Sequence, residues 1–521
     1  MPDPALDGRR VGILVPLFSI PSSASWGIGE IADLPMLGNW ARAAAVSVIQ
    51  LLPINEMADG QSSPYSALSA MAIDPIFISI RHVPGFREDD DDLLSPADRK
   101  DLDAVRRART VDHRSVRELK TRVLGRLFDR FMRRWQKGGP DVHALRSFIE
   151  TQAWWLDDYT LFRALHAENQ GRYWLEWDDA IRARQREVLK EARQRLERDI
   201  LYYAWLQWIA WEQWTAARRE LGEVAVLGDF PFMVSSDSAD VWSRQQEFRV
   251  DASVGVPPDA FSETGQDWGL PVYRWDVHEA NDYEWLRARA RRCAALYDGF
   301  RVDHLVGFYR TFVREKNGST CFVPADEQEQ RAQGERLMRL FLDSGAGIIA
   351  EDLGTVPDFV RESLASLGVP GLKVLRWERE WHAEGQPFRD PVSYPRVSVA
   401  ISGTHDTEPV AEWWDAAEPA ERRQVVQLPQ FRERNIAADN PFSDRIRDAV
   451  LESLYSAGSD LMLVPVQDVF GWRDRINVPA QVDDTNWSWR LPWPVERLAA
   501  EAEAVERSGY LRELARRYGR G

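Results

Sequence analysis

Cysteine is nearly absent from this chain of 521 residues, in which Cys293 and Cys321 are the only two. Two cysteines cannot supply the disulfide framework of a secreted scaffold, and no spacing of cysteine and histidine fits a metal site. We therefore expect no metal site and a reducing, cytoplasmic environment.

Positive charge is also in short supply. Lysine and arginine number 66 against 82 aspartates and glutamates, which gives a formal net charge of -16. Such a surface repels phosphate backbones and anionic lipid, so we expect no nucleic acid and no membrane as partner, and a neutral substrate fits better. No apolar stretch reaches the length that spans a bilayer. Residues 9–20 imitate a signal peptide, but the same apolar run is needed as the first strand of the fold.

Tryptophan is abundant, with 23 residues, and aromatic side chains make up 11% of the chain. Their flat apolar faces suit sugar rings, which have an apolar face and a hydroxyl rim. Core packing is the plainer explanation. We prefer it for most of them, including the tryptophans at helical spacing between residues 154 and 214.

Short apolar runs bounded by glycine, proline or aspartate predict buried parallel strands. They cover residues 12–18, 46–53, 224–232, 299–305, 347–353, 372–377, 397–403 and 461–469. Most are separated by segments with helical periodicity. Eight strand-helix units predict an α/β protein with a closed (β/α)8 TIM barrel.

The interval between the second and third runs is too long for one crossover. Its apolar residues recur at helical spacing, which predicts a helical insertion at residues 81–215. Residues 1–80 then form the first part of the barrel and residues 216–521 the remainder. The end of the chain, residues 494–520, reads as helical, so we expect no C-terminal β-domain.

Carboxylates follow the predicted strands where a barrel of this kind carries its active site. Asp303 ends the fourth strand, two residues after Arg301, so both side chains point the same way. An adjacent arginine lowers a carboxyl pKa and would keep Asp303 ionised as a nucleophile. A structural ion pair is the alternative.

Glu351 follows three apolar residues at the end of the fifth strand. A drier environment raises a carboxyl pKa, which suits a general acid, although Glu351 could merely be exposed beside Asp352 as a helix cap. One ionised and one protonated carboxyl is the division of labour in retaining glycoside cleavage, which needs them about 5 Å apart. Asp406, after the seventh strand, could accept hydrogen bonds from sugar hydroxyls, and His405 could donate to the same sugar.

Several blocks along the chain form a recognisable pattern. They are residues 63–66, 228–231, 238–242, 255–269, 301–304, 350–354, 403–406, 477–479 and 486–490. With these blocks in this order, the sequence resembles the 4-α-glucanotransferases, the amylomaltase or disproportionating-enzyme family (glycoside hydrolase family 77). The block at 255–269 is the most specific.

The resemblance implies a retaining enzyme that moves segments of α-1,4-glucan between maltooligosaccharides or amylose. It makes Asp303 the nucleophile, Glu351 the general acid/base and Asp406 the stabiliser of the transition state. It also implies glucan-binding roles for Tyr65, Asp229, Gln266, Trp268, Arg301, Trp377, His405 and Asn477. Gln266 and Trp268 would lie on a lid loop at 254–270, and Trp377 on the acceptor side. The family needs no cofactor.

The sequence departs from the family pattern in three places. Thr407, Glu408 and Pro409 replace the usual polar continuation, residues 321–333 replace a stretch rich in glycine and tryptophan, and residues 66–76 lack an arginine. These changes leave acceptor choice and product size open, along with the oligomeric state, for which a monomer is plausible. The competing interpretations are an α-amylase-type hydrolase and an inactive glucan-binding protein.

Overall fold

The computed structural model describes residues 8–58, 60–258, 265–479, 481, 483 and 485–521. Within them, eight parallel strands close into a barrel in the order β1-β12-β11-β10-β9-β6-β3-β2. The strands are β1 (Arg10–Leu14), β2 (Val48–Gln50), β3 (Ala225–Phe230), β6 (Gly299–Val302), β9 (Gly347–Ala350), β10 (Gly371–Val374), β11 (Ser398–Ile401) and β12 (Leu461–Pro465). The predicted TIM barrel is therefore confirmed.

The barrel interior is filled by a compact set of branched apolar side chains. Alternate residues of one strand belong to it, such as Leu372 and Val374 on β10 and Val399 and Ile401 on β11. Their neighbours in sequence face the surrounding helices, which is why these strands are apolar throughout rather than alternating. This continuous apolar character made them visible in the sequence.

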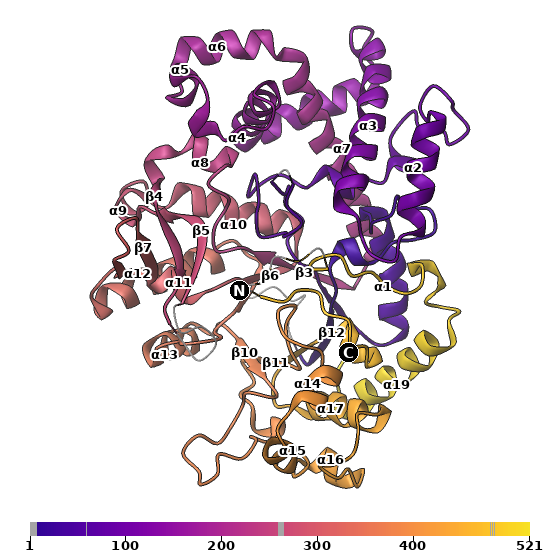
Figure 1. The fold of residues 1–521 in the computed structure, drawn as a ribbon, viewed down its shortest axis with the longest axis vertical. Helices are drawn as coiled ribbons and strands as arrows, with labels where there is room; N and C mark the ends of the chain where they lie inside the picture. Colours follow the sequence, from indigo (N-terminus) through magenta and orange to yellow (C-terminus); the bar gives the residue numbers. More distant parts are fainter. Residues whose placement is uncertain (1–7, 59, 259–264, 480, 482, 484) are drawn as a thin grey trace.

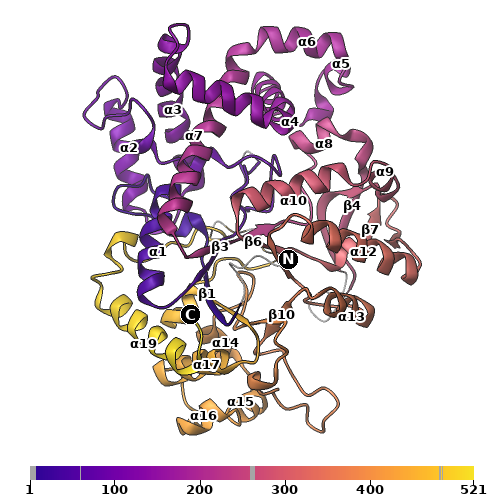
Figure 2. The same ribbon diagram turned by 180° about the vertical axis from the view of Figure 1, so that it is seen from behind.

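Helices surround the barrel on all sides (Figures 1 and 2). The longer ones are α1 (Leu34–Ala43), α10 (Glu284–Leu296), α12 (Glu327–Leu342), α13 (Asp358–Leu367), α17 (Asp444–Ser456) and α19 (Ala502–Tyr518). The shorter ones are α8 (Ala239–Ser243), α9 (Trp275–Ala280), α11 (Val306–Tyr309), α14 (Val410–Ala416), α15 (Pro419–Val425), α16 (Pro429–Glu433) and α18 (Val466–Phe470). Short 3-10 turns include η3 (Ile31–Asp33), η4 (Pro75–Phe77) and η5 (Ile80–His82).

The long interval between β2 and β3 is helical, as predicted. It contains α2 (Pro96–Arg107), α3 (His113–Trp135), α4 (Pro140–Glu168), α5 (Asp179–Arg182), α6 (Arg186–Arg195) and α7 (Glu197–Leu221), at the top of Figure 1. Side-chain caps start three of these helices: Ser95 forms a capping box with Asp98, Asp112 accepts from the Ser115 N–H, and Asp178 accepts from the Ala180 N–H. Most tryptophans here are buried as expected, but Trp154 is 50% exposed.

A second, antiparallel sheet was not predicted. Its order is β5-β4-β7-β8, from β4 (Phe248–Val256), β5 (Gln266–Tyr273), β7 (Thr311–Glu315) and β8 (Thr320–Val323). The lid loop expected at 254–270 is, at its two ends, the end of β4 and the start of β5, while residues 259–264 lie outside the described residues. Irregular β4–β5 register and mixed burial along β4 hide these strands from a search for apolar runs.

The described residues that follow β12 form helices and a 3-10 turn but no strand. No helix in the described part is both long and apolar enough to cross a membrane.

Candidate active site

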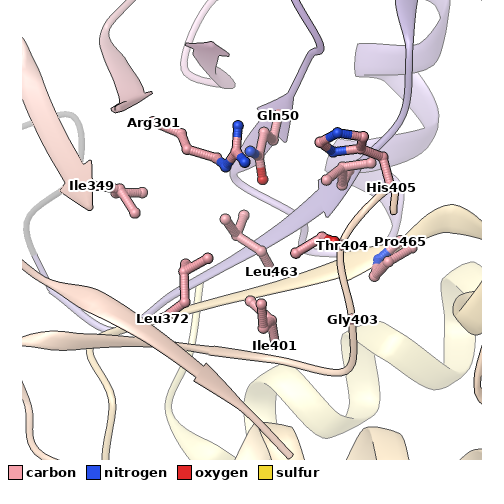
Figure 3. Close-up of a pocket in the computed structure, with 11 residues that line it drawn as sticks. Gln50, Arg301, Ile349, Leu372, Ile401, Gly403, Thr404, His405, Leu463 and Pro465 are labelled. Atoms are coloured by element: carbon pink, nitrogen blue, oxygen red, sulfur yellow. The ribbon is translucent and has the colours of Figure 1, made fainter. Parts of the chain in front are cut away.

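The carboxyl ends of four barrel strands place polar side chains next to one another. Asp229 on β3 pairs in register with Arg301 on β6, and Val302 on β6 pairs with Ala350, the residue before Glu351. Figure 3 shows Arg301 and His405 above a layer of apolar side chains from the barrel interior. The polar groups of the site therefore lie against the apolar side chains of the barrel interior.

Arg301 is the centre of this group, with a guanidinium that is almost completely buried. Its Nη1 lies 2.7 Å from Oδ2 of Asp229, and its Nη2 lies 3.0 Å from Oδ1 of Asp303 and 2.7 Å from Oε2 of Glu351. Because one nitrogen touches both, the last two oxygens are at most about 6 Å apart, which fits the ~5–5.5 Å separation of carboxyls in retaining enzymes rather than the wider gap of inverting ones. The separation of the two carboxyls and the positive charge beside them therefore suit a mechanism with a covalent intermediate.

Asp303 does not have the environment that the sequence suggested. Burial raises the pKa of Asp303 to about 8, and Arg301 opposes this only in part because it is shared with Asp229 and Glu351. The Phe232 N–H also donates a hydrogen bond to the carboxylate, at 3.2 Å. The expectation that Arg301 alone keeps Asp303 ionised was wrong for the empty site, because one guanidinium serves three carboxylates.

Glu351 is the opposite case. Burial raises its pKa, but Arg301 and the His304 backbone N–H, which donates to Oε2 at 2.7 Å, outweigh burial and hold the pKa below its usual value. The expectation of a raised pKa was wrong, because the Glu351 carboxylate meets two donors, Arg301 and the His304 N–H, despite the apolar residues that precede it. The pKa is therefore raised at Asp303 and lowered at Glu351.

Asp406 forms a separate ion pair at the end of β11. Its Oδ2 lies 3.3 Å from Nε2 of His405, and its Oδ1 accepts from Nδ2 of Asn477 at 2.7 Å. Burial raises the pKa of Asp406, but His405 and Asn477 outweigh it and hold the pKa well below its usual range. The side chain of Asp406 is 40% exposed and that of Asp303 is 21% exposed, so Asp406 is the more accessible of these two carboxylates to an entering ligand.

Tyr65 bridges these two groups. Its hydroxyl donates to Oδ2 of Asp229 at 2.9 Å, and its ring stacks on His405 at 5.4 Å with an interplanar angle of 16°. The Trp487 ring closes the cluster, 5.9 Å from Tyr65 and 5.7 Å from His405. Trp487 has a φ of 60°, a left-handed conformation that bulky residues rarely adopt outside functional sites.

The second sheet reaches the site through Trp268. Its indole Nε1 donates to Oε1 of Gln266 at 3.2 Å, and its ring meets that of His304 edge-on at 4.7 Å. His304 also has a positive φ, 42°, and its backbone N–H is the donor to Glu351. One residue thus joins the β4–β5 ribbon to the carboxylate pair.

The 4-alpha-glucanotransferase family model matches residues 15–496. The chain belongs to this family. It is 32% identical to the 4-alpha-glucanotransferase of Thermus thermophilus over 537 aligned residues, which cover 96% of this chain and 99% of the relative. The Chlamydia pneumoniae 4-alpha-glucanotransferase is 28% identical, over 96% of this chain and 94% of the relative.

Among solved structures, the amylomaltase from Streptococcus agalactiae in complex with acarbose is similar, with a TM-score of 0.82 and 26% identity. The alignment covers 98% of this chain and 100% of that one. As a 4-alpha-glucanotransferase, the chain is an enzyme that transfers glucan segments.

Trp377, expected on the acceptor side of this 4-alpha-glucanotransferase, stands apart. It lies three residues beyond β10 with 39% of its surface exposed, and within the described part of the chain no hydrogen bond or ring contact joins it to the carboxylates.

No cluster of three or more possible metal ligands occurs among the described residues.

Two residues of the site, His304 and Trp487, received no role from the sequence. Both lie inside motifs that were noticed, at 301–304 and 486–490, and this was the available signal. Their positive φ values could not be read from the sequence, since neither is a glycine or an asparagine.

Proposed function

We propose that this site transfers α-1,4-glucan segments through a covalent intermediate, with Asp303 as nucleophile and Glu351 as general acid/base. The observation that carries the proposal is the single Arg301 nitrogen within hydrogen-bond distance of both carboxylates. It brings the pair to the separation that retaining chemistry needs and supplies the positive charge that offsets the second carboxylate.

In the first step, an Asp303 oxygen forms a bond to the anomeric carbon while the bond from that carbon to the glycosidic oxygen breaks. Glu351 gives its proton to the leaving oxygen. In the second step, the Glu351 carboxylate takes the proton of an acceptor hydroxyl, whose oxygen attacks the same carbon and releases Asp303. The first step needs a proton on Glu351, and a glycosidic oxygen favours this protonated form by accepting its hydrogen bond.

The remaining residues hold the sugar. Asp406, kept ionised by His405 and fixed by Asn477, accepts hydrogen bonds from sugar hydroxyls that strengthen as the ring distorts. Tyr65 stacks on the sugar at the cleavage point, and Arg301 and Asp229 line the same subsite.

The acceptor half of the site is assigned to three side chains. Gln266 and Trp268, on the ribbon at 254–270, cover the glucan, and Trp377 offers an exposed aromatic face to the acceptor. The acarbose complex of the Streptococcus agalactiae amylomaltase supports a glucan-like ligand here.

Maltotriose as the sole substrate tests the reaction. Transfer conserves the number of glycosidic bonds, so we expect glucose and a ladder of longer oligosaccharides with a nearly constant number of reducing ends. A steady rise in reducing ends without longer products would identify a hydrolase and overturn the proposal. Glu351→Gln should give neither outcome, because the leaving oxygen then receives no proton.

The setting of the enzyme is inferred from its composition. The net charge of -16 and the two cysteines support a cytoplasmic enzyme that meets neither nucleic acid nor membrane. We also retain the division into residues 1–80, 81–215 and 216–521 and a monomeric state as proposals. Cell fractionation and sedimentation analysis test the location and the oligomeric state.

A further inference from the structure

The Tyr65 loop, of which residues 54–58 and 60–74 are described, is built like a hairpin with Tyr65 near its tip. Backbone hydrogen bonds join its two arms: Asp74 N–H to Ile54 O at 2.9 Å, Glu56 N–H to Ala72 O at 3.1 Å and Ala58 N–H to Ser66 O at 2.8 Å. Such pairing ties the arms together both at the base and beside Tyr65. We therefore expect a displacement at the base to reach the Tyr65 ring.

Helices of the insertion, rather than the barrel strands, hold the base of this loop. Gln207 on α7 accepts from the Ile73 N–H at 3.0 Å and donates to the Ile73 carbonyl at 2.8 Å. Its side-chain amide therefore hydrogen-bonds both backbone polar groups of Ile73. The same Gln207 nitrogen lies 3.1 Å from the Tyr159 hydroxyl on α4, which itself donates to Oε2 of Glu56 at 2.5 Å. Gln207, Tyr159 and Glu56 are each at most 2% exposed.

A third helix fixes the last residue of the loop. Arg117 on α3 donates from both terminal nitrogens to Asp74, at 2.9 and 2.7 Å, and Asp74 also accepts from the Met57 N–H on the opposite arm. A two-pronged bond of this kind fixes direction as well as distance. Three helices of the insertion thus grip one loop through buried polar groups.

We infer that Gln207 and Tyr159 are positioning residues for transfer: through the Tyr65 loop, the helical insertion sets the place of the Tyr65 ring against His405 and Asp229. This rests on the proposed function in that Tyr65 is taken to contact the sugar. The insertion then acts on the chemistry without touching substrate. A small misplacement of a substrate-contacting group costs up to about a hundredfold in rate, so losses at the base should be visible in kcat.

The chain offers a matched control. Gln213, six residues further along α7, makes the same pair of bonds to Ser79, at 2.8 and 3.0 Å, and is also buried. Ser79 lies outside the Tyr65 loop, at the start of η5. Gln207→Leu and Gln213→Leu therefore each remove one such pair of backbone bonds from the same helix. Gln207→Leu also removes the bond to Tyr159, and only Gln207→Leu releases the loop.

We expect both variants to lower Tm by similar amounts and only Gln207→Leu to lower kcat for maltotriose, by about tenfold. Tyr159→Phe, a milder change at the same base, should lower kcat in the same direction. Equal kcat for the two leucine variants, measured where both are folded, would overturn the inference.

The route through Tyr65 is tested with Tyr65→Ala. In that background Gln207→Leu should change kcat less than about twofold, because coupled residues are not additive. Full additivity would show that Gln207 acts elsewhere and would overturn the inference, leaving the proposed function intact. Wild-type kcat in Tyr65→Ala itself would instead refute the role proposed for Tyr65, and with it the route of this inference.

Discussion

At the scale of single residues, the site is short of positive charge. Among the described residues, Arg301 is the cation that contacts Asp229, Asp303 and Glu351, and all four side chains are largely withdrawn from water. Three carboxylates around one buried guanidinium cannot all be ionised at low cost, so we expect one proton to stay in the group. In the proposed mechanism, this proton serves the general acid.

The pH dependence of kcat/KM should report this proton. Burial raises the pKa of Asp303 to about 8, while the pKa of Glu351 is lowered, so the pair carries one proton below about pH 8 and none above it. The first step needs that proton, and we expect kcat/KM to fall about tenfold for each pH unit above the pKa.

Asp229 and His405 could also give this limb, because burial raises the pKa of Asp229 and because Asp406 raises the pKa of His405 against the effect of burial. His405→Asn should be slower but keep the same limb. Loss of the limb in this variant would assign it to His405 and contradict the shared proton.

The nucleophile is tested by Asp303→Asn, which is nearly isosteric and removes the attacking charge. We expect kcat to fall by several orders of magnitude, since covalent catalysis depends on the carboxylate. Thermal unfolding should show no loss of stability, because the change also removes an ionisable group from a buried site.

Asp298 is the matched control for this substitution. It stands at the opposite end of the same strand, where it accepts from Arg218 and from the Val226 N–H. Asp298→Asn should lower Tm and leave kcat within about twofold, as expected for a change at the stability face of the barrel. If Asp303→Asn kept a tenth of the wild-type rate, another group would be the nucleophile.

At the scale of elements, the sequence predicted the strands and helices whose burial determines which residue types they contain. The barrel strands are apolar on both faces and the insertion repeats with a helical period, so both were visible. The β4–β5 ribbon is mixed in burial and irregular in register, and of the motif at 255–269, which was expected to be a loop, the described ends belong to its two strands. The carboxylates were found from their places at strand ends, but their pKa values depend on how Arg301 is shared, which only the fold determines.

The ribbon carries the next prediction. Trp268 lies edge-on to His304, whose backbone N–H binds Glu351, and there it can shed water and offer an aromatic face to an incoming sugar. Trp268→Ala should weaken attack by a sugar more than attack by water. The ratio of hydrolysis to transfer, from reducing ends and product lengths, should therefore rise.

Trp381, which is 60% exposed on another segment, is the control for loss of a surface tryptophan. Trp381→Ala should leave the ratio as in the wild type. If Trp268→Ala lowered both rates in proportion, the ribbon would serve donor binding or stability rather than the choice of acceptor.

At the scale of the whole molecule, the insertion and the barrel share buried charge. Lys120 on α3 is almost completely buried, and its ammonium donates to the carbonyls of Ile76 and Ile78, at 2.7 and 2.8 Å, and lies 2.8 Å from Oε1 of Glu30. Its three protons therefore all have acceptors. Glu30 also accepts from the Trp26 N–H, so the contact ties the insertion to the chain just after β1.

We therefore expect the insertion and the barrel to unfold together, in one transition. Lys120→Met leaves Glu30 buried without its cation, which costs about 3–5 kcal/mol and, for a chain of this length, lowers Tm by about 3–5 °C. Adding Glu30→Gln should recover part of the loss, because the uncompensated charge is then gone. Lys190→Met, at an exposed pair with Glu187, should change Tm by less than about 1 °C.

The measurement is thermal unfolding followed by far-UV circular dichroism, which reports on the helices, and by tryptophan fluorescence. Two separated transitions, with helix lost first in Lys120→Met, would show that the insertion is an independent folding unit, whereas a single lowered transition would show that this buried pair makes the two parts one cooperative structure.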